Sequence, residues 1–137
     1  MEEEIILDES YVRVKHIPSL KLIMVTWNGV ATKDQYQGVF SHSLDYQAKI
    51  GIPVYNFLSD IRKQGVVNPE NRKWFEENAL PRAINQGLRR AGVVFDGNIF
   101  KKYYLNLILQ ATNKFKLPFK FFSSVEDAHD WFKSFDE

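Results

Sequence analysis

The chain has 137 residues, of which 45% are hydrophobic and 26% charged, and this is the size and composition of one globular domain. It contains no cysteine, which excludes disulfides, thiolate metal sites and cysteine nucleophiles, and favours a reducing cytoplasm. The net charge is +1, but residues 11–122 carry +10 and the two ends carry −9. We expect the acidic ends to pack over the basic middle; the alternative is a basic face for an anionic partner.

The N-terminal segment MEEEIILDES is acidic and has no basic stretch before a long apolar run, so it does not resemble a signal peptide. No apolar run approaches the ~20 residues that a transmembrane helix needs. We therefore expect one cytoplasmic domain, residues 1–137, that does not insert into a membrane.

The first third of the chain predicts three strands. Residues 5–9 and 11–17 are rich in β-branched and apolar residues, and in the second of these Val12, Val14 and His16 alternate with a more polar set. Residues 20–29 form a continuous apolar run, as in a strand covered on both faces. Their close spacing favours an antiparallel meander.

From about residue 32 the apolar residues recur at the spacing of a helix. Thr32 and Gln35 form a capping box for a helix that Gly51 can end. Residues 54–59 predict the next strand, and Asn68 and Pro69 begin a further helix. Pro81 should kink or break that helix, so that a second short helix runs to about residue 86.

The last third repeats the strand and helix alternation. Residues 88–96 predict a strand, a turn at 96–98 leads into an amphipathic helix, and residues 117–122 predict another strand. A second capping box at 123–126 begins the last helix. The fold class is therefore α/β: a mixed sheet of about six strands, with an antiparallel N-terminal meander followed by βαβ units and with helices packed on it.

Several stretches carry a family resemblance: VTWNGVATKDQYQGVF, NFLSDIR, NPENRKWFEENALPRAINQGLRRAGVVF and FKFFSSVEDAHDWF. With them the chain resembles the STAS-like, SpoIIAA-like domains of anti-sigma-factor antagonists, in an uncharacterised bacterial branch. The resemblance implies a single STAS-like domain that is a non-enzymatic binding or regulatory module. In that family a serine after a central strand, in an Asp-Ser-Ser-Gly-type loop, is phosphorylated. Here Asp60 follows Ser59 and no Ser-Gly follows, which argues against phosphorylation of Ser59.

The candidate site is the segment after strand 54–59. Ser59, Asp60 and Arg62 lie at the expected carboxyl end of a parallel strand, where open α/β sheets bind ligands. A carboxylate beside a guanidinium is either a ligand clamp or a local ion pair, and the sequence favours the ion pair. Trp27 and Trp74 flank loops at or near the same end and are candidates for an apolar pocket or a partner surface.

Metal, cofactor and anion sites have weaker support in the sequence. His16, His42 and His129 lie on separate elements, and no glycine-rich phosphate loop is present, so we predict no metal and no cofactor. A helix start after residues 96–98, with Lys101 and Lys102 one turn in, could hold an anion but is more typical of a solvated helix end.

Three functions follow in order of preference. The first is a non-enzymatic module that binds a protein partner or a small ligand near a 59–65 loop. The second is a small enzyme that uses Asp60 and Arg62 in a crevice at the strand end. The third, which the scattered charges argue against, is a nucleic-acid binder using basic residues with nearby aromatics; these are Arg72, Lys73, Arg82, Arg89, Arg90, Lys101 and Lys102. The sequence leaves homodimer formation open.

Overall fold

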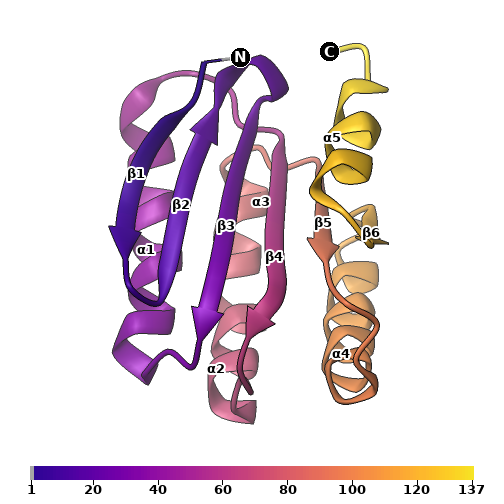
Figure 1. Cartoon of the computed structure of the whole chain (residues 1–137). Helices are drawn as coiled ribbons and strands as arrows, with labels where there is room; N and C mark the ends of the chain where they lie inside the picture. The colour runs from indigo at the N-terminus through magenta and orange to yellow at the C-terminus, as the bar shows by residue number, and fades with distance from the viewer. Residues whose placement is uncertain (1) are drawn as a thin grey trace.

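The computed structural model describes residues 2–137, so residue 1 of the predicted domain lies outside the described residues. A six-stranded sheet has its strands in chain order, β1 to β6, with helices on both faces (Figure 1). The strands are β1 (Glu4–Glu9), β2 (Val12–Ile17), β3 (Leu22–Gly29), β4 (Asn56–Gln64), β5 (Arg90–Val94) and β6 (Phe119–Phe122). The helices are η1 (Pro18–Leu20), α1 (Lys33–Ile50), α2 (Pro69–Trp74), η2 (Phe75–Ala79), α3 (Leu80–Asn85), α4 (Ile99–Lys114) and α5 (Val125–Lys133).

The sheet is mixed, as predicted. β1, β2 and β3 pair antiparallel, and β3, β4, β5 and β6 pair parallel. Each parallel pair is joined by a helical crossover, because parallel neighbours cannot be linked by a short hairpin. The predicted α/β class and the meander followed by βαβ units are confirmed.

The two faces of the sheet are covered unequally. Helices α1, α2, α3 and α4 lie behind the sheet in Figure 1, whereas α5 lies in front of its right-hand part alone. The larger core, on the side of the four helices, includes Val14, Val25 and Trp27; the smaller core, under α5, includes Leu58 and Phe132. The front of β2 carries polar side chains such as Arg13 and Lys15. Ile17 at its end, with Leu22 and Met24 of β3, joins or packs against the smaller core.

The helix starts follow the predicted caps. Thr32 and Gln35 form the complete capping box of α1, and Asn68 accepts a hydrogen bond from the Asn71 amide at the start of α2. At α5 the cap is Ser124, which accepts from the Asp127 amide, so the predicted box at 123–126 is wrong by one residue. Asp127, like the predicted Glu126, places negative charge in the first turn, where the helix dipole favours it.

Pro81 changes the helix that contains it without ending it. Proline has no amide hydrogen and its ring would collide with the carbonyl four residues earlier, here that of Glu77. The chain accommodates this with five residues of π-helix, η2, between α2 and α3. The predicted second helix is present as α3 and ends at Asn85, but a widened turn separates it from α2 where we expected a kink or a break.

The predicted end of the fourth strand is wrong. β4 continues through Asp60 and Arg62 to Gln64, so residues 59–64 of the expected loop are strand. β4 extends past the last residue of β5. In this extension β4 continues to pair with β3, up to the partners Gly29 and Gln64. Lys101 from α4 donates to the exposed carbonyls of Ile61 and Arg62, at 2.8 and 3.2 Å. This ammonium supplies hydrogen bonds that a neighbouring strand would otherwise supply.

The acidic ends of the chain pack onto the basic middle, as the charge distribution predicted. Near the N-terminus, Asp8 pairs with Arg13 at 3.2 Å, and Glu3 pairs with Lys15 at 3.2 Å. At the other end, Glu137 pairs with Arg89 at 2.9 Å.

Candidate functional site

A cavity of about 70 Å³ lies between the sheet and the helix layer, at the centre of the molecule. Its floor is formed by β3, β4, β5 and β6, and its roof by α1, η2, α3 and α4. Apolar and aromatic side chains predominate in its lining, and they include Trp27, Tyr36, Phe40, Phe57, Phe75, Ala83, Tyr104 and Phe119. Phe57 and Ser59 face the helix layer from the middle of β4 but are only partly buried. The helices therefore do not close completely over this part of the sheet.

One polar contact stands in the wall of the cavity. The Trp27 indole Nε1 donates a hydrogen bond to Ser59 Oγ at 3.1 Å. The parallel register brings the two side chains together, because Val25 on β3 lies opposite Ser59 on β4. Ser59 acts as the acceptor in this contact, so its own O–H proton remains able to donate to a ligand.

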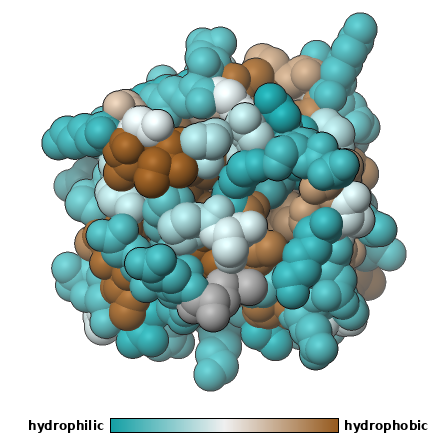
Figure 2. All heavy atoms as spheres, turned by 90° about the horizontal axis from the view of Figure 1, so that it is seen from above, coloured by the Kyte–Doolittle hydropathy of each residue, from teal (hydrophilic) through white to brown (hydrophobic). Residues whose placement is uncertain are grey.

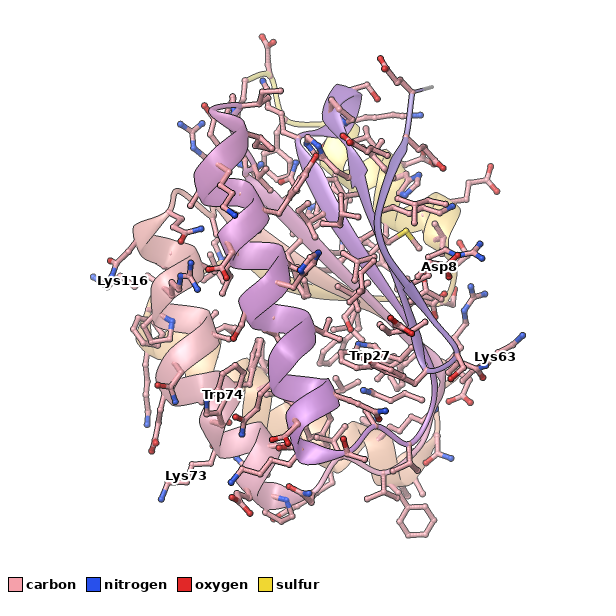
Figure 3. The ribbon with its side chains drawn as sticks, turned by 90° about the vertical axis from the view of Figure 1, so that its left-hand side faces the viewer. Asp8, Trp27, Lys63, Lys73, Trp74 and Lys116 are labelled. Carbon is pink, nitrogen blue, oxygen red and sulfur yellow. The ribbon has the colours of Figure 1, made fainter. Side chains whose placement is uncertain are left out.

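The Trp27 ring is fixed by its neighbours. It stacks on Tyr36 with ring centroids 5.4 Å apart and an interplanar angle of 22°, and it lies 6.0 Å from Phe40. Figure 3 shows Trp27 in the space between the sheet and α1, turned inward. A buried aromatic ring with its N–H satisfied makes a rigid wall for an apolar site.

The other polar groups of the cavity wall are neutral or already bonded. Burial raises the pKa of the Tyr36 phenol well above its usual value and also raises the pKa of Tyr104, so both stay protonated at neutral pH. Ser43 donates to the Val39 carbonyl at 2.7 Å, and Thr112 donates to the Leu109 carbonyl at 2.9 Å. This wall therefore suits an apolar ligand better than a charged one.

Asp60 and Arg62 lie on the opposite face of β4 from Ser59, since side chains alternate along a strand. Arg62 donates to Asp60 through Nε at 3.0 Å and through Nη2 at 2.7 Å, a bidentate pair. The Asp60 side chain is 7% exposed and that of Arg62 is 44% exposed. The hydrogen bond to Asp60 raises the pKa of the Arg62 guanidinium further. The two residues face each other, and neither lines the cavity.

Trp74 is also outside the cavity lining. It projects from the end of α2 and packs beside Phe40, with ring centroids 6.4 Å apart. Figure 3 shows it on the far side of α1 from Trp27, next to the outward-pointing Lys73. The structure thus brings two of the five candidate site residues, Trp27 and Ser59, together at the cavity, and it pairs Asp60 with Arg62 on the other face of the sheet.

Two of the three histidines, and the helix start considered as an anion site, take structural roles. His16 Nδ1 lies 3.0 Å from the Tyr46 hydroxyl, and His42 Nε2 lies 2.9 Å from the Ile6 carbonyl. No group of three or more His, Asp or Glu side chains within residues 2–137 is placed to hold a metal ion. Lys101 at the start of α4 is used by the carbonyls of β4 and lies 3.9 Å from Asp96.

Most of the basic residues considered for nucleic acid have acidic partners. Arg72 pairs with Glu76, Arg82 pairs with Asp45, and Arg89 and Arg90 both bind Glu137. These pairs lower the local positive charge that phosphate recognition requires.

Apolar side chains are exposed at the carboxyl end of the sheet, near the end of β4. Val30 and Val66 are 70% and 86% exposed, and the side chain of Val30 lies directly against Gly65. On the first turn of α4, Ile99, Phe100 and Tyr103 are 74%, 83% and 71% exposed. Sequence reasoning missed this surface, because Phe100 recurs at helical spacing with Tyr104, Ile108 and Ala111, and that pattern predicts a buried side chain.

Sequence reasoning also missed most of the cavity lining. Ala83, Tyr104 and Ile108 reach the cavity from α3 and α4. Their helical spacing predicts burial, and burial against a tight core gives the same pattern as burial around a cavity. No signal in a single sequence separates these two cases.

Comparisons with known proteins support the fold. The chain matches no protein family profile and no curated protein sequence. A solved structure, an uncharacterised protein of the DUF3478 family with a SpoIIAA-like fold from Shewanella loihica PV-4, is similar with a TM-score of 0.58. The match covers 96% of this chain and 92% of that chain at 18% sequence identity.

The predicted STAS-like, SpoIIAA-like fold is therefore confirmed, and the similarity at this identity concerns the fold alone. Within residues 2–137, no helix has both the length and the apolar character needed to cross a bilayer.

Proposed function

We propose that the protein is a non-enzymatic binding module that takes a small, largely apolar ligand in the cavity between the sheet and the helix layer. The observation that carries the proposal is the Trp27–Ser59 hydrogen bond in the wall of that cavity. It leaves the Ser59 hydroxyl proton available in a site lined mainly by apolar and aromatic side chains. Such a site, with few polar groups that fix orientation, is typical of small-molecule binding.

The chemistry of the wall defines the ligand class. A planar apolar molecule can stack among Trp27, Phe57 and Phe119, and one hydrogen-bond acceptor on it can take the Ser59 proton. Among residues 2–137 no charged side chain lines the cavity, so a charged ligand would lose its hydration there without gaining a counter-charge.

The cavity is too small for such a ligand as it stands, so the helix layer must move when the ligand binds. The cavity, at about 70 Å³, is smaller than the apolar cavity of about 150 Å³ that admits benzene in an engineered protein. The π-helical η2 supplies Phe75 and Ala79 to the roof, and its widened turn is where the α2–α3 segment can bend.

The test uses two ligands that differ in one acceptor. Acetophenone carries a carbonyl oxygen on an aromatic ring, and ethylbenzene has the same shape without it. We expect both to shift the Trp27 indole N–H signal in two-dimensional NMR titrations. Acetophenone should bind about fivefold to tenfold more tightly, which is the value of one hydrogen bond of about 1 kcal/mol. Ser59→Ala should remove that preference.

A matched pair of variants locates the binding. Ala83→Leu fills the cavity from α3, and Ala48→Leu adds the same atoms to the exposed side of α1. Ala83→Leu should weaken both ligands by about tenfold or more, a loss of about 1.4 kcal/mol, whereas Ala48→Leu should leave them unchanged. Equal affinities in the two variants would place the ligands elsewhere and refute the proposal.

A protein partner is the second candidate, favoured by the exposed apolar residues near the end of β4. Val66 and Phe100 are 86% and 83% exposed, and exposed apolar patches are typical of interaction surfaces. If neither aromatic ligand binds, this surface becomes the preferred site of function.

Catalysis by Asp60 and Arg62 has less support than either binding function. Both carboxylate oxygens of Asp60 accept from Arg62, which leaves that carboxylate little capacity to act as a base. Nucleic-acid binding has less support because most of the basic residues considered for it form ion pairs.

A further inference from the structure

A second cavity, of about 170 Å³, opens at the amino end of the parallel strands, opposite the end where the exposed apolar residues lie. It lies where β4 and β5 begin and α5 ends, at the top of Figure 1, where the label of the C-terminus also lies. Figure 2 looks onto this end of the molecule, which is mainly hydrophilic around separate apolar patches. The side chains of its lining that bear on binding are Lys21, Asn56, Arg90, Lys133, Phe135 and Glu137.

A buried arginine forms the inner wall of this cavity. The side chain of Arg90 is 7% exposed. Its Nη1 donates to Asn56 Oδ1 at 2.8 Å, its Nη2 donates to Glu137 Oε1, and its guanidinium lies 3.7 Å from the centre of the Phe135 ring. Its Nε is buried and has no acceptor among residues 2–137. A buried guanidinium with an unused N–H donor can bind an anion.

Further positive charge surrounds the same point. Arg89 Nη1 donates to Glu137 Oε2 at 2.9 Å, and Lys21 Nζ donates to the main-chain oxygen of Glu137. Lys133 lines the cavity from the end of α5. Arg89 and Arg90 thus bind the side-chain carboxylate of Glu137, Lys21 binds its main-chain oxygen, and Lys133 adds a fourth cation to the cavity wall. The hydrogen bonds from Arg90 and then Arg89 hold the pKa of the Glu137 carboxyl below its usual value.

The segment that provides the carboxylate has little structure of its own. Residues 136 and 137 follow the end of α5 and belong to no helix or strand. Glu137 is therefore held by the cations and not by a surrounding helix, so a free anion of similar shape can compete with it.

We propose that Arg90 and its neighbours form a binding site for a small dicarboxylate, and that Glu137 occupies this site as an internal competitor. The two groups of Glu137 that are bound define the ligand. One is the side-chain carboxylate, which accepts through both of its oxygens, and the other is the main-chain oxygen; three carbons lie between their two carbonyl carbons. Glutarate has the same spacing between its two carboxylates, whereas butyrate reproduces one of them.

The test is calorimetric titration with glutarate at low ionic strength, on the full chain. Glu137→Ala removes the competitor, and Asp136→Ala removes the same charge from the neighbouring residue, for which no ion pair is present among residues 2–137. We expect Glu137→Ala to bind glutarate about tenfold more tightly than the wild type, because a tethered competitor acts at millimolar effective concentration. Asp136→Ala should bind like the wild type.

Further variants keep the proposal falsifiable without disturbing the buried Arg90. Two rim variants are each made in the Glu137→Ala protein: Arg89→Gln, which removes the partner of Glu137 Oε2, and Lys133→Gln, which removes a cation of the cavity lining. Each should weaken glutarate binding by about twofold to fivefold. Butyrate should bind Glu137→Ala more weakly than glutarate. The proposal is overturned if Glu137→Ala gains no affinity, if the rim variants bind glutarate unchanged, or if inorganic phosphate binds as tightly as glutarate.

Discussion

At the scale of single residues, Ser59 has a clear structural partner. It stands in the middle of β4 and faces aromatic side chains, where a hydroxyl would be costly without a partner. Trp27 is 2% exposed, so its indole N–H equally needs an acceptor. The 3.1 Å hydrogen bond gives the indole N–H its acceptor and the Ser59 oxygen a donor, and it leaves the Ser59 proton available. A serine is present at position 59 because its oxygen accepts a hydrogen bond from Trp27 on the neighbouring strand.

Replacing Ser59 and Trp27 singly and together should reveal an interaction energy between the two side chains. Ser59→Ala leaves the buried Trp27 N–H without an acceptor and should lower the free energy of unfolding by about 1–3 kcal/mol. Trp27→Phe removes the donor together with part of the ring. In the double variant the loss should be smaller than the sum of the two single losses by about 0.5–1.5 kcal/mol.

The measurement is urea unfolding of the four proteins, followed by circular dichroism. If the loss in the double variant equals the sum of the two single losses to within about 0.3 kcal/mol, the contact contributes nothing to stability.

The sequence could identify Ser59 and Trp27 as candidates but could not pair them. They are 32 positions apart, and their contact depends on the register between β3 and β4. The pair of Asp60 and Arg62 was predictable as a local ion pair because the two residues are two positions apart on one side of a strand. Local contacts can be inferred from spacing, whereas contacts across a parallel pair depend on the whole crossover.

At the scale of elements, the error in β4 has a physical cause. Polar residues after an apolar run suggested the end of a strand, but Asp60 and Arg62 lie on the face of the sheet that α5 covers only in part. A strand with one open face continues with alternating residues, and Ile61 keeps the buried side apolar. Which face α5 leaves open follows from tertiary packing, which one sequence does not reveal.

The packing of α5 on the sheet depends on a glycine in β5. A methyl group at Gly92 would lie 2.9 Å from Phe122 Cε2 and 3.4 Å from Leu58 Cδ1. Phe122 cannot easily retreat, because Trp131 of α5 packs on it with ring centroids 5.5 Å apart. Gly92→Ala should therefore destabilise the protein by about 1–3 kcal/mol through overpacking.

The matched control is Gly38→Ala. Gly38 lies on the exposed side of α1, and apart from the helix's own backbone a methyl group there meets no atom of residues 2–137 within 4 Å. Alanine favours a helix over glycine, so this variant should gain about 0.5–1 kcal/mol. Thermal unfolding of both variants tests the pair. If Gly92→Ala were as stable as Gly38→Ala, the contact between α5 and the sheet would be looser than described.

At the scale of the whole molecule, polar contacts tie the two ends of the chain to its middle. At the N-terminal end, the Tyr46 hydroxyl on α1 donates to Glu4 at 2.9 Å and lies 3.0 Å from His16 Nδ1 on β2. Burial, with a smaller contribution from Glu4, raises the pKa of Tyr46 to about 12, so its proton stays in place at all ordinary pH values. This network joins β1, β2 and α1.

The network makes stability depend on pH through His16. Burial lowers the pKa of His16 below its ordinary value of 6.5, against a smaller opposite effect of Glu4. The unfolded chain therefore binds a proton at this residue more readily than the folded chain does. The contribution of neutral His16 to stability is complete above pH 6.5 and is lost as the pH falls through the folded-state pKa.

We therefore expect the free energy of unfolding to fall between pH 7 and pH 5.5, and to fall less in His16→Gln. The pKa of His129 is lowered too, by burial and then by Lys133, so His129→Gln should also flatten the curve, and the double variant should be flattest. Urea unfolding at several pH values measures the slopes. The slope is the informative quantity, because His16→Gln also changes packing and hydrogen bonding, which shift the whole curve. A slope in His16→Gln equal to that of the wild type would show that His16 takes up its proton without unfolding, and that the contact with Tyr46 survives protonation.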